Sequence, residues 1–275
     1  MSSEPVGGRL WTSAEAYEQY VGRWSRRVAD EFLRWLCAAP GSRWLDVGCG
    51  TGALTERILE SQYPASILGV DASSTFVASA CSRLRSPRVD FVVGAAQELP
   101  TRPSAFDVAV TGLVLNFVPG PDRAIVEFAR TLGAGSMAAA YLWDYARGMQ
   151  MMRYFWDAAI ALNPAAHELD EGERCSICQP ELLEELWQSA GFHSVEACAI
   201  DVPTVFADFD DFWQPFLAGR APAPAYVMSL SERQRTALRE EIRSRVPVEK
   251  DGTLRLVARA WAVKGTASPR DRARN

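Results

Sequence analysis

The sequence has few histidines, no excess of positive charge and no long apolar run. Of its 275 residues, two are histidine, and 29 Lys and Arg are outnumbered by 34 Asp and Glu, which leaves a net charge of -5. This acidic balance argues against a dedicated nucleic-acid binder, because such proteins usually present a basic face. No apolar run approaches the roughly 18 residues that a membrane-spanning helix needs. We therefore expect neither nucleic acid nor a membrane as a partner.

Paired metal-ligand motifs are also missing. Of the six cysteines, only Cys175 and Cys178 form a Cys-x-x-Cys pair, and a zinc site needs a second pair or a histidine pair at ligand spacing. His167 and His193 stand alone, so we expect no metal and interpret the cysteine pair as structural, with zinc as the alternative. The N-terminus shows no basic segment followed by an apolar one. With mostly unpaired cysteines, this favours a reducing, cytoplasmic location.

What the sequence does have is a regular alternation of apolar strands and amphipathic helices. The predicted strands cover residues 43–47, 66–71, 88–93, 106–112 and 137–143. They are apolar throughout rather than at every second residue, which is typical of a parallel sheet covered by helices on both faces. Glycines at 133–135 are expected to end the helix before the fifth strand. A helix at 180–190 and two long strands, 193–202 and 254–263, follow.

The stretch LDVGCGTGALTE (45–56) joins the first strand to the first helix of this alternation. The dinucleotide fingerprint is G-x-G-x-x-G, which delivers a pyrophosphate to a helix N-terminus. Here Gly48, Gly50 and Gly52 are spaced G-x-G-x-G, and Asp46 precedes them. A carboxylate at this place would repel a pyrophosphate and suits a cationic ligand. The alternative to a ligand-binding loop is that the three glycines only form a tight turn.

A second acid, Asp71, ends the second strand, 19 residues beyond Gly52. An acid at this place can accept hydrogen bonds from both hydroxyls of a ribose. These residues predict a pocket that binds a ribose and favours a positively charged ligand over a phosphate. S-adenosylmethionine has these properties, because it carries ribose, adenine, an ammonium and a sulfonium and no phosphate. We therefore expect S-adenosyl-L-methionine as the cofactor.

Four successive stretches resemble the motifs of class I S-adenosylmethionine-dependent methyltransferases in order and spacing. They are LDVGCGTGALTE, GVDAS, VGAAQELP and FDVAVTGLVLNFVPGPDRAIVEFARTL. The resemblance covers about residues 20–143, and QPELLEELWQSAGF resembles a later helix of the small-molecule branch. It implies an α/β, Rossmann-like fold: a seven-stranded, mostly parallel sheet with an antiparallel last strand and helices on both faces. An N-terminal helical lid and a helical insertion before the last strand complete the implied fold.

The resemblance also implies a cofactor site in the loops at the carboxyl ends of the first four strands. Its members would be Asp46, Gly48, Cys49, Gly50, Gly52, Asp71, Ala72, Ser73, Ala96, Gln97, Thr111, Gly112 and Leu113. Asp71 would hold the ribose, and Ala96 and Gln97 would border the adenine. Ala95 is a departure, because relatives often have an aspartate there that bonds the adenine amino group.

The segment YVGRWSRR (20–27) resembles the helix that covers this cofactor in a bacterial subgroup. Tyr20 and Trp24 would pack on the cofactor, and Arg26 would pair with its carboxylate, with Arg23 as second choice. A solvated basic helix face is an equally weighted alternative.

The expected organisation is one methyltransferase domain, residues 11–265, between a disordered N-terminus (1–10) and a disordered tail (266–275). Within the domain, residues 11–38 form the helical lid and 43–143 the cofactor-binding core. Residues 144–178 and 203–250 supply the acceptor side.

The acceptor site is less specified. The [DN]-P-P-[YFW] motif of enzymes that methylate exocyclic amines and the Pro-Cys of enzymes that attack pyrimidine rings are both absent, which favours a small-molecule acceptor. Asp144, Tyr145 and Asn116 are the candidate catalytic or anchoring residues, although Asp144 can instead cap the following helix. His167 is a weaker candidate base. An apolar or aromatic acceptor is suggested by aromatic residues near these positions: Trp143, Phe155, Trp156, Phe212, Trp213 and Phe216.

The sequence therefore predicts methyl transfer to an oxygen, nitrogen or carbon atom of a small molecule by in-line displacement, releasing S-adenosylhomocysteine. A nicotinamide-dependent oxidoreductase and a non-catalytic S-adenosylmethionine-binding protein are the alternatives. A monomer and a homodimer are both compatible with the sequence.

Overall fold

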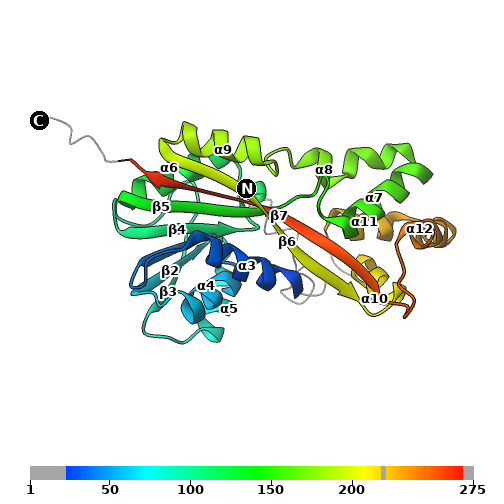
Figure 1. Ribbon diagram of the computed structural model, residues 1–275, viewed down its shortest axis with the longest axis horizontal. Coiled ribbons are helices and arrows are strands. Elements are labelled where there is room, and N and C mark those ends of the chain that lie inside the picture. Colours follow the sequence, from blue (N-terminus) through cyan, green and yellow to red (C-terminus); the bar gives the residue numbers. More distant parts are fainter. Residues whose placement is uncertain (1–22, 218–220, 269–275) are drawn as a thin grey trace, which may run out of the picture. The chain divides into compact units, whose positions relative to one another are not determined.

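A seven-stranded sheet of order β3-β2-β1-β4-β5-β7-β6 organises the fold (Figure 1). The computed structural model describes residues 23–217 and 221–268. The strands are β1 (Arg43–Val47), β2 (Ser66–Asp71), β3 (Val89–Val93), β4 (Phe106–Gly112), β5 (Leu132–Trp143), β6 (Phe192–Phe206) and β7 (Leu254–Ala267). The first five pair in parallel, and the last strands are antiparallel. The predicted fold class is confirmed.

The strand order places the loop after β1 at the point where the chain changes direction across the sheet. From β1 the chain moves outward through β2 and β3 and then returns to the other side of β1 with β4. Asp46 pairs in register with Gly69 on β2 and with Val110 on β4. Ligands of open parallel sheets bind beyond the carboxyl ends of the strands at such a switch point.

Local sequence signals explain where many helices begin. The Ser73 hydroxyl accepts a hydrogen bond from the Phe76 N–H at 3.3 Å and caps its helix, and Pro121 occupies a first-turn position. The helices are α3 (Arg23–Leu36), α4 (Ala53–Ser61), α5 (Ser74–Arg83), α6 (Pro121–Thr131), α7 (Gln150–Leu162), α8 (Glu171–Arg174), α9 (Pro180–Ser189), α10 (Phe209–Trp213), α11 (Pro222–Ser229) and α12 (Glu232–Arg245). Three short 3-10 turns are η2 (Leu115–Phe117), η3 (Pro164–Leu169) and η4 (Gln214–Leu217).

Strand boundaries differ from the sequence prediction by more than one residue at three places. β5 begins at Leu132, not at 137, because Leu132 pairs with Phe106 across an irregular register and the glycines at 133–135 continue the strand. β6 extends to Phe206, and β7 to Ala267, beyond the predicted start of the disordered tail at 266. Long antiparallel partners support each other past the apolar stretch that marks a strand in sequence. Residues 1–22 of the predicted N-terminus and lid lie outside the described residues.

The chain divides into two compact units. Within the described residues, the sheet unit comprises residues 29–142, 179–200 and 261–268, and the helical unit comprises residues 23–28, 143–178, 201–217 and 221–260. In the sheet unit, the buried Trp187 indole N–H donates to the Ala138 carbonyl at 3.1 Å and fixes α9 against β5. The prediction of a single domain from 11 to 265 stays a prediction.

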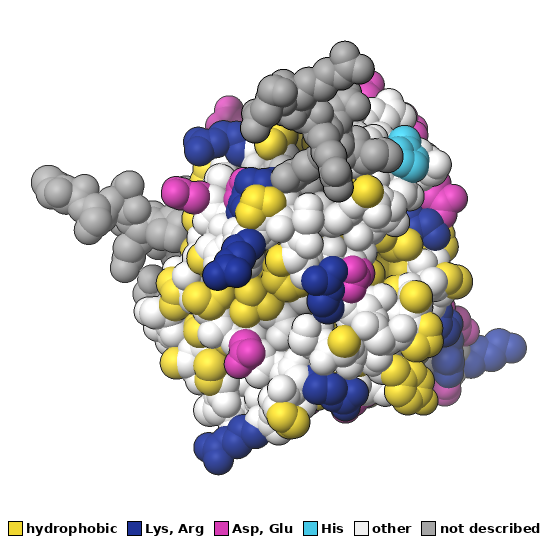
Figure 2. All heavy atoms as spheres, turned by 90° about the vertical axis from the view of Figure 1, so that its left-hand side faces the viewer, with side chains coloured by type: hydrophobic (Ala, Val, Ile, Leu, Met, Phe, Trp, Pro, Cys, Tyr) yellow, Lys and Arg dark blue, Asp and Glu magenta, His cyan; other side chains and the backbone are white. Residues whose placement is uncertain are grey.

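The surface carries charges of both signs. On the face shown in Figure 2, basic and acidic side chains are interspersed among apolar and uncharged ones and do not gather by sign. None of the helices in the described part of the chain combines the length and apolarity that crossing a bilayer requires.

The interior of the sheet provides a test of its packing. A Cβ at Gly69 would lie 2.4 Å from Phe91 Cδ1 and 3.0 Å from Cys49 Sγ. Gly69→Ala should therefore lower the free energy of unfolding by about 1–3 kcal/mol, as overpacking of a core does. Gly133→Ala is the matched control, because the nearest atom to its added Cβ is Ser136 Oγ at 3.4 Å. Urea denaturation of both variants measures the difference, and equal losses would contradict the packing at Gly69.

Candidate functional site

The glycine loop between β1 and α4 turns through left-handed backbone conformations. Gly48 and Gly50 have φ values of 74° and 55°, a region that glycine adopts without steric cost. The N–H groups of Gly48 and Cys49 donate to the Val70 carbonyl at 2.7 and 3.1 Å, so the loop continues the pairing of β1 with β2.

The loop is closely packed at one glycine and open at another. A Cβ at Gly48 would lie 2.4 Å from Val114 Cγ1, whereas a Cβ at Gly50 would meet no atom within 4 Å. Val114 belongs to the loop after β4, so that loop packs directly on the first glycine. The space in front of Gly50 leaves the middle of the loop accessible to a ligand.

Asp46 lies in β1 just before this loop and is 1% exposed. Its Oδ2 accepts a hydrogen bond from the Thr55 hydroxyl at 2.6 Å. Its Oδ1 is buried and has no hydrogen-bond partner. Burial raises the pKa of Asp46 to about 7, with a smaller contribution from the charge of Asp71, while the Thr55 hydroxyl lowers it. A buried carboxylate oxygen without a donor favours a cationic or hydrogen-bond-donating ligand.

Asp71, at the end of β2, ties the glycine loop to the next turn. Its Oδ2 accepts from the Gly50 N–H at 2.9 Å, and its Oδ1 accepts from the Ser73 N–H at 2.8 Å. The side chain is half-buried. Burial raises the pKa of Asp71, whereas the two backbone donors lower it by a smaller amount. Each carboxylate oxygen retains a second lone pair that can accept from a ligand hydroxyl.

Other predicted cofactor residues lie at the same edge of the sheet. Ala72 is exposed, and Ala96 and Gln97 are half-buried. The Gln97 amide donates to the Pro119 carbonyl at 2.5 Å, which connects the loop after β3 to the loop after β4.

The end of β4 carries backbone strain. Leu113 has a φ of 60°, and its N–H donates to the Tyr141 carbonyl at 2.8 Å. Such conformations cost about 1–3 kcal/mol and cluster at functional sites. Thr111 is buried, and Gly112 lies against the Tyr141 ring, whose Oη would be 2.5 Å from an added Cβ. This loop is therefore held in one shape by β5.

Asn116 lies in η2 on the same loop. Its Nδ2 is buried and has no hydrogen-bond partner. The sheet unit thus contains an unsatisfied acceptor on Asp46 and an unsatisfied donor on Asn116, each beyond or near the carboxyl end of a central strand. A molecule with both donor and acceptor groups would satisfy them.

The predicted lid residues belong to the other unit or lie outside the description. Tyr20 is outside the described residues, and the side chain of Arg23 is not described. Trp24 is buried in the helical unit with its ring edge-on to Phe206 at 5.2 Å between centroids. Arg26 is exposed. Their predicted roles toward the cofactor stay predictions.

Asp144 is buried in the helical unit, where its Oδ1 accepts from the Arg147 N–H at 3.0 Å. It thereby closes the turn that follows β5, while α7 begins only at Gln150. Asp144 therefore does not cap α7, whose N-cap residue is Met149, and its predicted role toward the acceptor stays a prediction. Tyr145 beside it is half-buried.

The aromatic residues expected to line an acceptor pocket form the core of the helical unit instead. All six are buried: Trp143, Phe155, Trp156, Phe212, Trp213 and Phe216. Phe155 stacks on Phe216 at 4.5 Å between centroids, and Phe212 and Trp213 also contact Phe216. Large aromatic rings bury the most apolar area per residue, so composition alone cannot distinguish a core from a pocket lining.

A buried acidic group in the helical unit was not anticipated from the sequence. The Trp156 indole N–H donates to Glu171 Oε2, and burial raises the pKa of Glu171 to about 8. Next to it, Asp170 pairs with Arg153 at 2.5 Å. Carboxyls with raised pKa values occur at catalytic sites, but no spacing motif marks Glu171 in the sequence.

The isolated histidines and the cysteine pair show no metal geometry. His167 and His193 are both exposed. The Cys178 N–H donates to the Cys175 carbonyl at 3.0 Å, so the pair sits in a turn. Within residues 23–217 and 221–268, no group of three or more His, Cys, Asp or Glu side chains is arranged to hold a metal ion.

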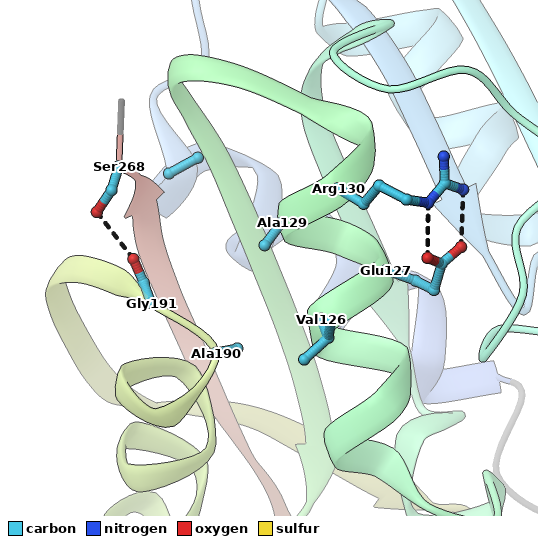
Figure 3. A pocket seen from close by; sticks show the side chains of 8 residues that line it. Val126, Glu127, Ala129, Arg130, Ala190, Gly191 and Ser268 are labelled. Carbon is cyan, nitrogen blue, oxygen red and sulfur yellow. Dashed lines mark hydrogen bonds and ion pairs between the residues drawn. The ribbon is translucent and has the colours of Figure 1, made fainter. Parts of the chain in front are cut away.

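A shallow cavity of about 440 Å³ lies elsewhere in the sheet unit, between α6, the end of α9 and the end of β7 (Figure 3). Glu127 and Arg130 form an ion pair at its wall, and Ser268 donates to the Gly191 carbonyl at 2.9 Å. Because α6 runs back to the start of β5, this cavity is at the amino edge of the parallel strands. It is therefore distinct from the glycine-loop site.

Comparisons with known proteins agree with this geometry. Residues 45–140 match the family described as methyltransferase domain. Trans-aconitate 2-methyltransferase of Methylobacterium nodulans is 34% identical over 49% of this chain and 50% of its own length. The 2-phytyl-1,4-naphtoquinone methyltransferase of a Nostoc species is 29% identical over 54% and 68%, respectively. The chain thus spans only half the length of the first of these relatives.

A solved structure extends the comparison to the fold. Phosphoethanolamine N-methyltransferase 2 of Haemonchus contortus, in complex with S-adenosyl-L-methionine, superposes with a TM-score of 0.56 at 18% identity, covering 93% of this chain and 56% of that one. The strand order and the glycine loop define the Rossmann-like fold of the class I methyltransferases, whose cofactor is S-adenosylmethionine. Residues 45–140 are thus similar to a methyltransferase domain, and the fold of the chain is that of the class I S-adenosylmethionine-dependent methyltransferases.

The buried charge at the site predicts a pH-dependent stability. The pKa of Asp46 is raised to about 7 in the folded protein, so the folded state holds a proton that the unfolded state has lost between about pH 4 and 7. The contribution of Asp46 to the free energy of unfolding therefore falls as the pH rises through that window. Asp46→Asn removes the effect, so its melting temperature should exceed that of the wild type by several degrees at pH 8 and match it only near pH 4, below this window. A constant difference at both pH values would contradict burial of the charge.

Glu171 predicts a similar effect at higher pH. Its pKa of about 8 means that stability from this group falls between about pH 4.5 and 8. Glu171→Gln keeps an acceptor for the Trp156 indole and should be more stable than the wild type at pH 9 but equal to it only near pH 4, below the titration window. Thermal melts with the exposed Glu168→Gln as control measure this, and a loss of stability at both pH values would show that Glu171 must be charged.

Proposed function

We propose that the protein transfers a methyl group from S-adenosylmethionine to a small-molecule acceptor. One observation carries this proposal: two acids, Asp46 and Asp71, flank a glycine loop whose middle is open, and one of them has a buried oxygen without a donor. This combination favours a cationic, ribose-containing ligand and disfavours a pyrophosphate. It also argues against a nicotinamide dinucleotide, which would bring two phosphates to these carboxylates.

The residues present fit the cofactor. Asp46 Oδ1 supplies an acceptor for the ammonium of the methionine part, and the accessible face of Gly50 leaves room for it. Asp71 supplies acceptors for the ribose hydroxyls while its two backbone donors hold it in place. Ala96 and Gln97 border the adenine in this proposal. Ala95 leaves the adenine amino group without the carboxylate that relatives often offer.

The cofactor supplies a methyl group on a sulfonium, which is already activated toward an in-line displacement. The protein must then align the acceptor and exclude water. The rigid turn at Leu113 suits alignment, because its backbone is fixed by Tyr141. The unsatisfied Nδ2 of Asn116 is the group we assign to an oxygen of the acceptor.

A small molecule is the acceptor class that the relatives favour. Their names specify trans-aconitate and 2-phytyl-1,4-naphtoquinone, two unrelated small molecules. In the proposed organisation, residues 144–178 and 203–250 supply the acceptor side, which includes the polar side chains of Asp144, Tyr145 and Glu171. We propose a cytoplasmic location, because none of the six cysteines, all within the described residues, is joined in a disulfide.

Calorimetric titration tests the cofactor. S-adenosylmethionine should bind the wild type, and NADH should not. Asp71→Ala should weaken S-adenosylmethionine binding by about tenfold or more, because it removes charge-assisted hydrogen bonds. Asp90→Asn is the matched control, an exposed acid on the neighbouring strand β3, and should bind like the wild type.

Three outcomes decide the proposal. Absence of heat with S-adenosylmethionine, or tighter binding of NADH, would overturn the cofactor assignment. Binding without release of S-adenosylhomocysteine across a metabolite panel would favour the non-catalytic alternative. Unchanged affinity in Asp71→Ala would move the ribose away from β2.

A further inference from the structure

Thr55 is the one hydroxyl that contacts the buried Asp46 carboxylate, among the interactions of the described residues. It lies in the first turn of α4, is fully buried, and donates to Oδ2 at 2.6 Å. The hydrogen bond joins the helix after the glycine loop to the strand before it. Nothing in the loop sequence itself requires a hydroxyl at this position.

The groups around Asp46 show why the Thr55 hydrogen bond affects the ionisation of this carboxyl. Its pairing partners on the neighbouring strands are Gly69 and Val110, which carry no charge. The charged group that acts on Asp46 is Asp71 on β2, which opposes its ionisation. The nearby Cys49 thiol stays neutral, because burial and both acids raise its pKa. In the described part of the site, the Thr55 hydroxyl and, to a smaller extent, the Thr55 backbone favour the charged form of Asp46, because a donor to a carboxylate stabilises the anion.

We propose, on the basis of the proposed function, that Thr55 is a positioning residue that couples cofactor binding to the ionisation of Asp46. The hydroxyl holds Oδ2 and leaves Oδ1 for the ammonium of the cofactor. In the ionised form, Asp46 binds this cation, and in the protonated form it does not attract it. S-adenosylmethionine binding thus releases a proton from Asp46 to the solvent at neutral pH.

The direction of the pH dependence distinguishes titration of Asp46 from titration of the cofactor ammonium. Ionisation of Asp46 strengthens binding as the pH rises. Deprotonation of the cofactor ammonium weakens binding as the pH rises further, because it removes the positive charge. A rise in affinity between pH 6 and 8 therefore reports the protein group.

The test is calorimetric titration of S-adenosylmethionine into the full chain at several pH values between 6 and 8. The wild-type affinity should rise by about tenfold over this range, as expected for one group that titrates near its middle. The measured heat should also depend on the ionisation enthalpy of the buffer, which reports the released proton directly and requires no turnover.

Three variants assign the effect. Thr55→Val keeps the shape and removes the donor, so the transition of Asp46 should move upward by about one pH unit. Binding should then be about tenfold weaker than in the wild type at pH 6 and only about twofold weaker at pH 8. Thr55→Ser keeps a hydroxyl and should retain the wild-type profile. Asp46→Asn should bind weakly with no rise in affinity between pH 6 and 8.

The outcomes separate this inference from the proposed function. Failure of the wild type to bind S-adenosylmethionine at any pH overturns the proposed function. Binding with an affinity and a heat that do not depend on pH or buffer overturns the coupling alone. A Thr55→Val variant that binds more weakly by the same factor at every pH has only a structural defect and also overturns the inference. If Thr55→Val does not fold, the wild-type profile and Thr55→Ser still decide it.

Discussion

The burial of one carboxylate, Asp46, is the constraint on which the site depends. An isolated anion inside a protein is costly unless it is paired or hydrogen-bonded, and one oxygen of Asp46 has no donor. The apolar strands around it would form a more stable sheet with a neutral side chain at this position. A fold that keeps this charge retains a local cost, and the glycine loop beside it is where a ligand can offset that cost.

The two acids of the site divide their tasks. Asp71 accepts from two backbone N–H groups and thereby fixes the glycine loop to the start of α5. Asp46 is held by a side-chain hydroxyl and has an oxygen left over. One carboxylate therefore shapes the loop, and the other is available to a ligand. Removing Asp71 disturbs the architecture as well as the proposed ribose contact, whereas Asp46 can be neutralised with little change in shape.

Periodicity and turn residues predict much of the fold. The bounds of β1, β2 and β4 follow from short apolar runs between turn residues, and Ser73 and Pro121 mark helix starts. The glycine loop and its flanking acids follow from spacing. The hydrogen bond from Thr55 to Asp46 does not, because it depends on how α4 docks on the sheet, and a threonine in a helix has no fixed partner in sequence.

For the proposed acceptor side, the amino-acid composition led to a wrong expectation about the aromatic residues. Aromatic composition suggested a pocket, yet Phe155, Trp156 and Phe216 are buried against one another. A small helical unit needs such rings to bury enough apolar surface, so their abundance has a sufficient structural cause.

Recognition of the acceptor must then come from groups whose hydrogen bonds are incomplete. In the sheet unit, the Asn116 amide is such a group. The rigid loop from Leu113 to Asn116, which packs Val114 onto Gly48, joins that amide physically to the glycine loop. A change in the conformation of one loop must therefore affect the other, so binding of the cofactor can position the Asn116 side chain, which we propose contacts the acceptor.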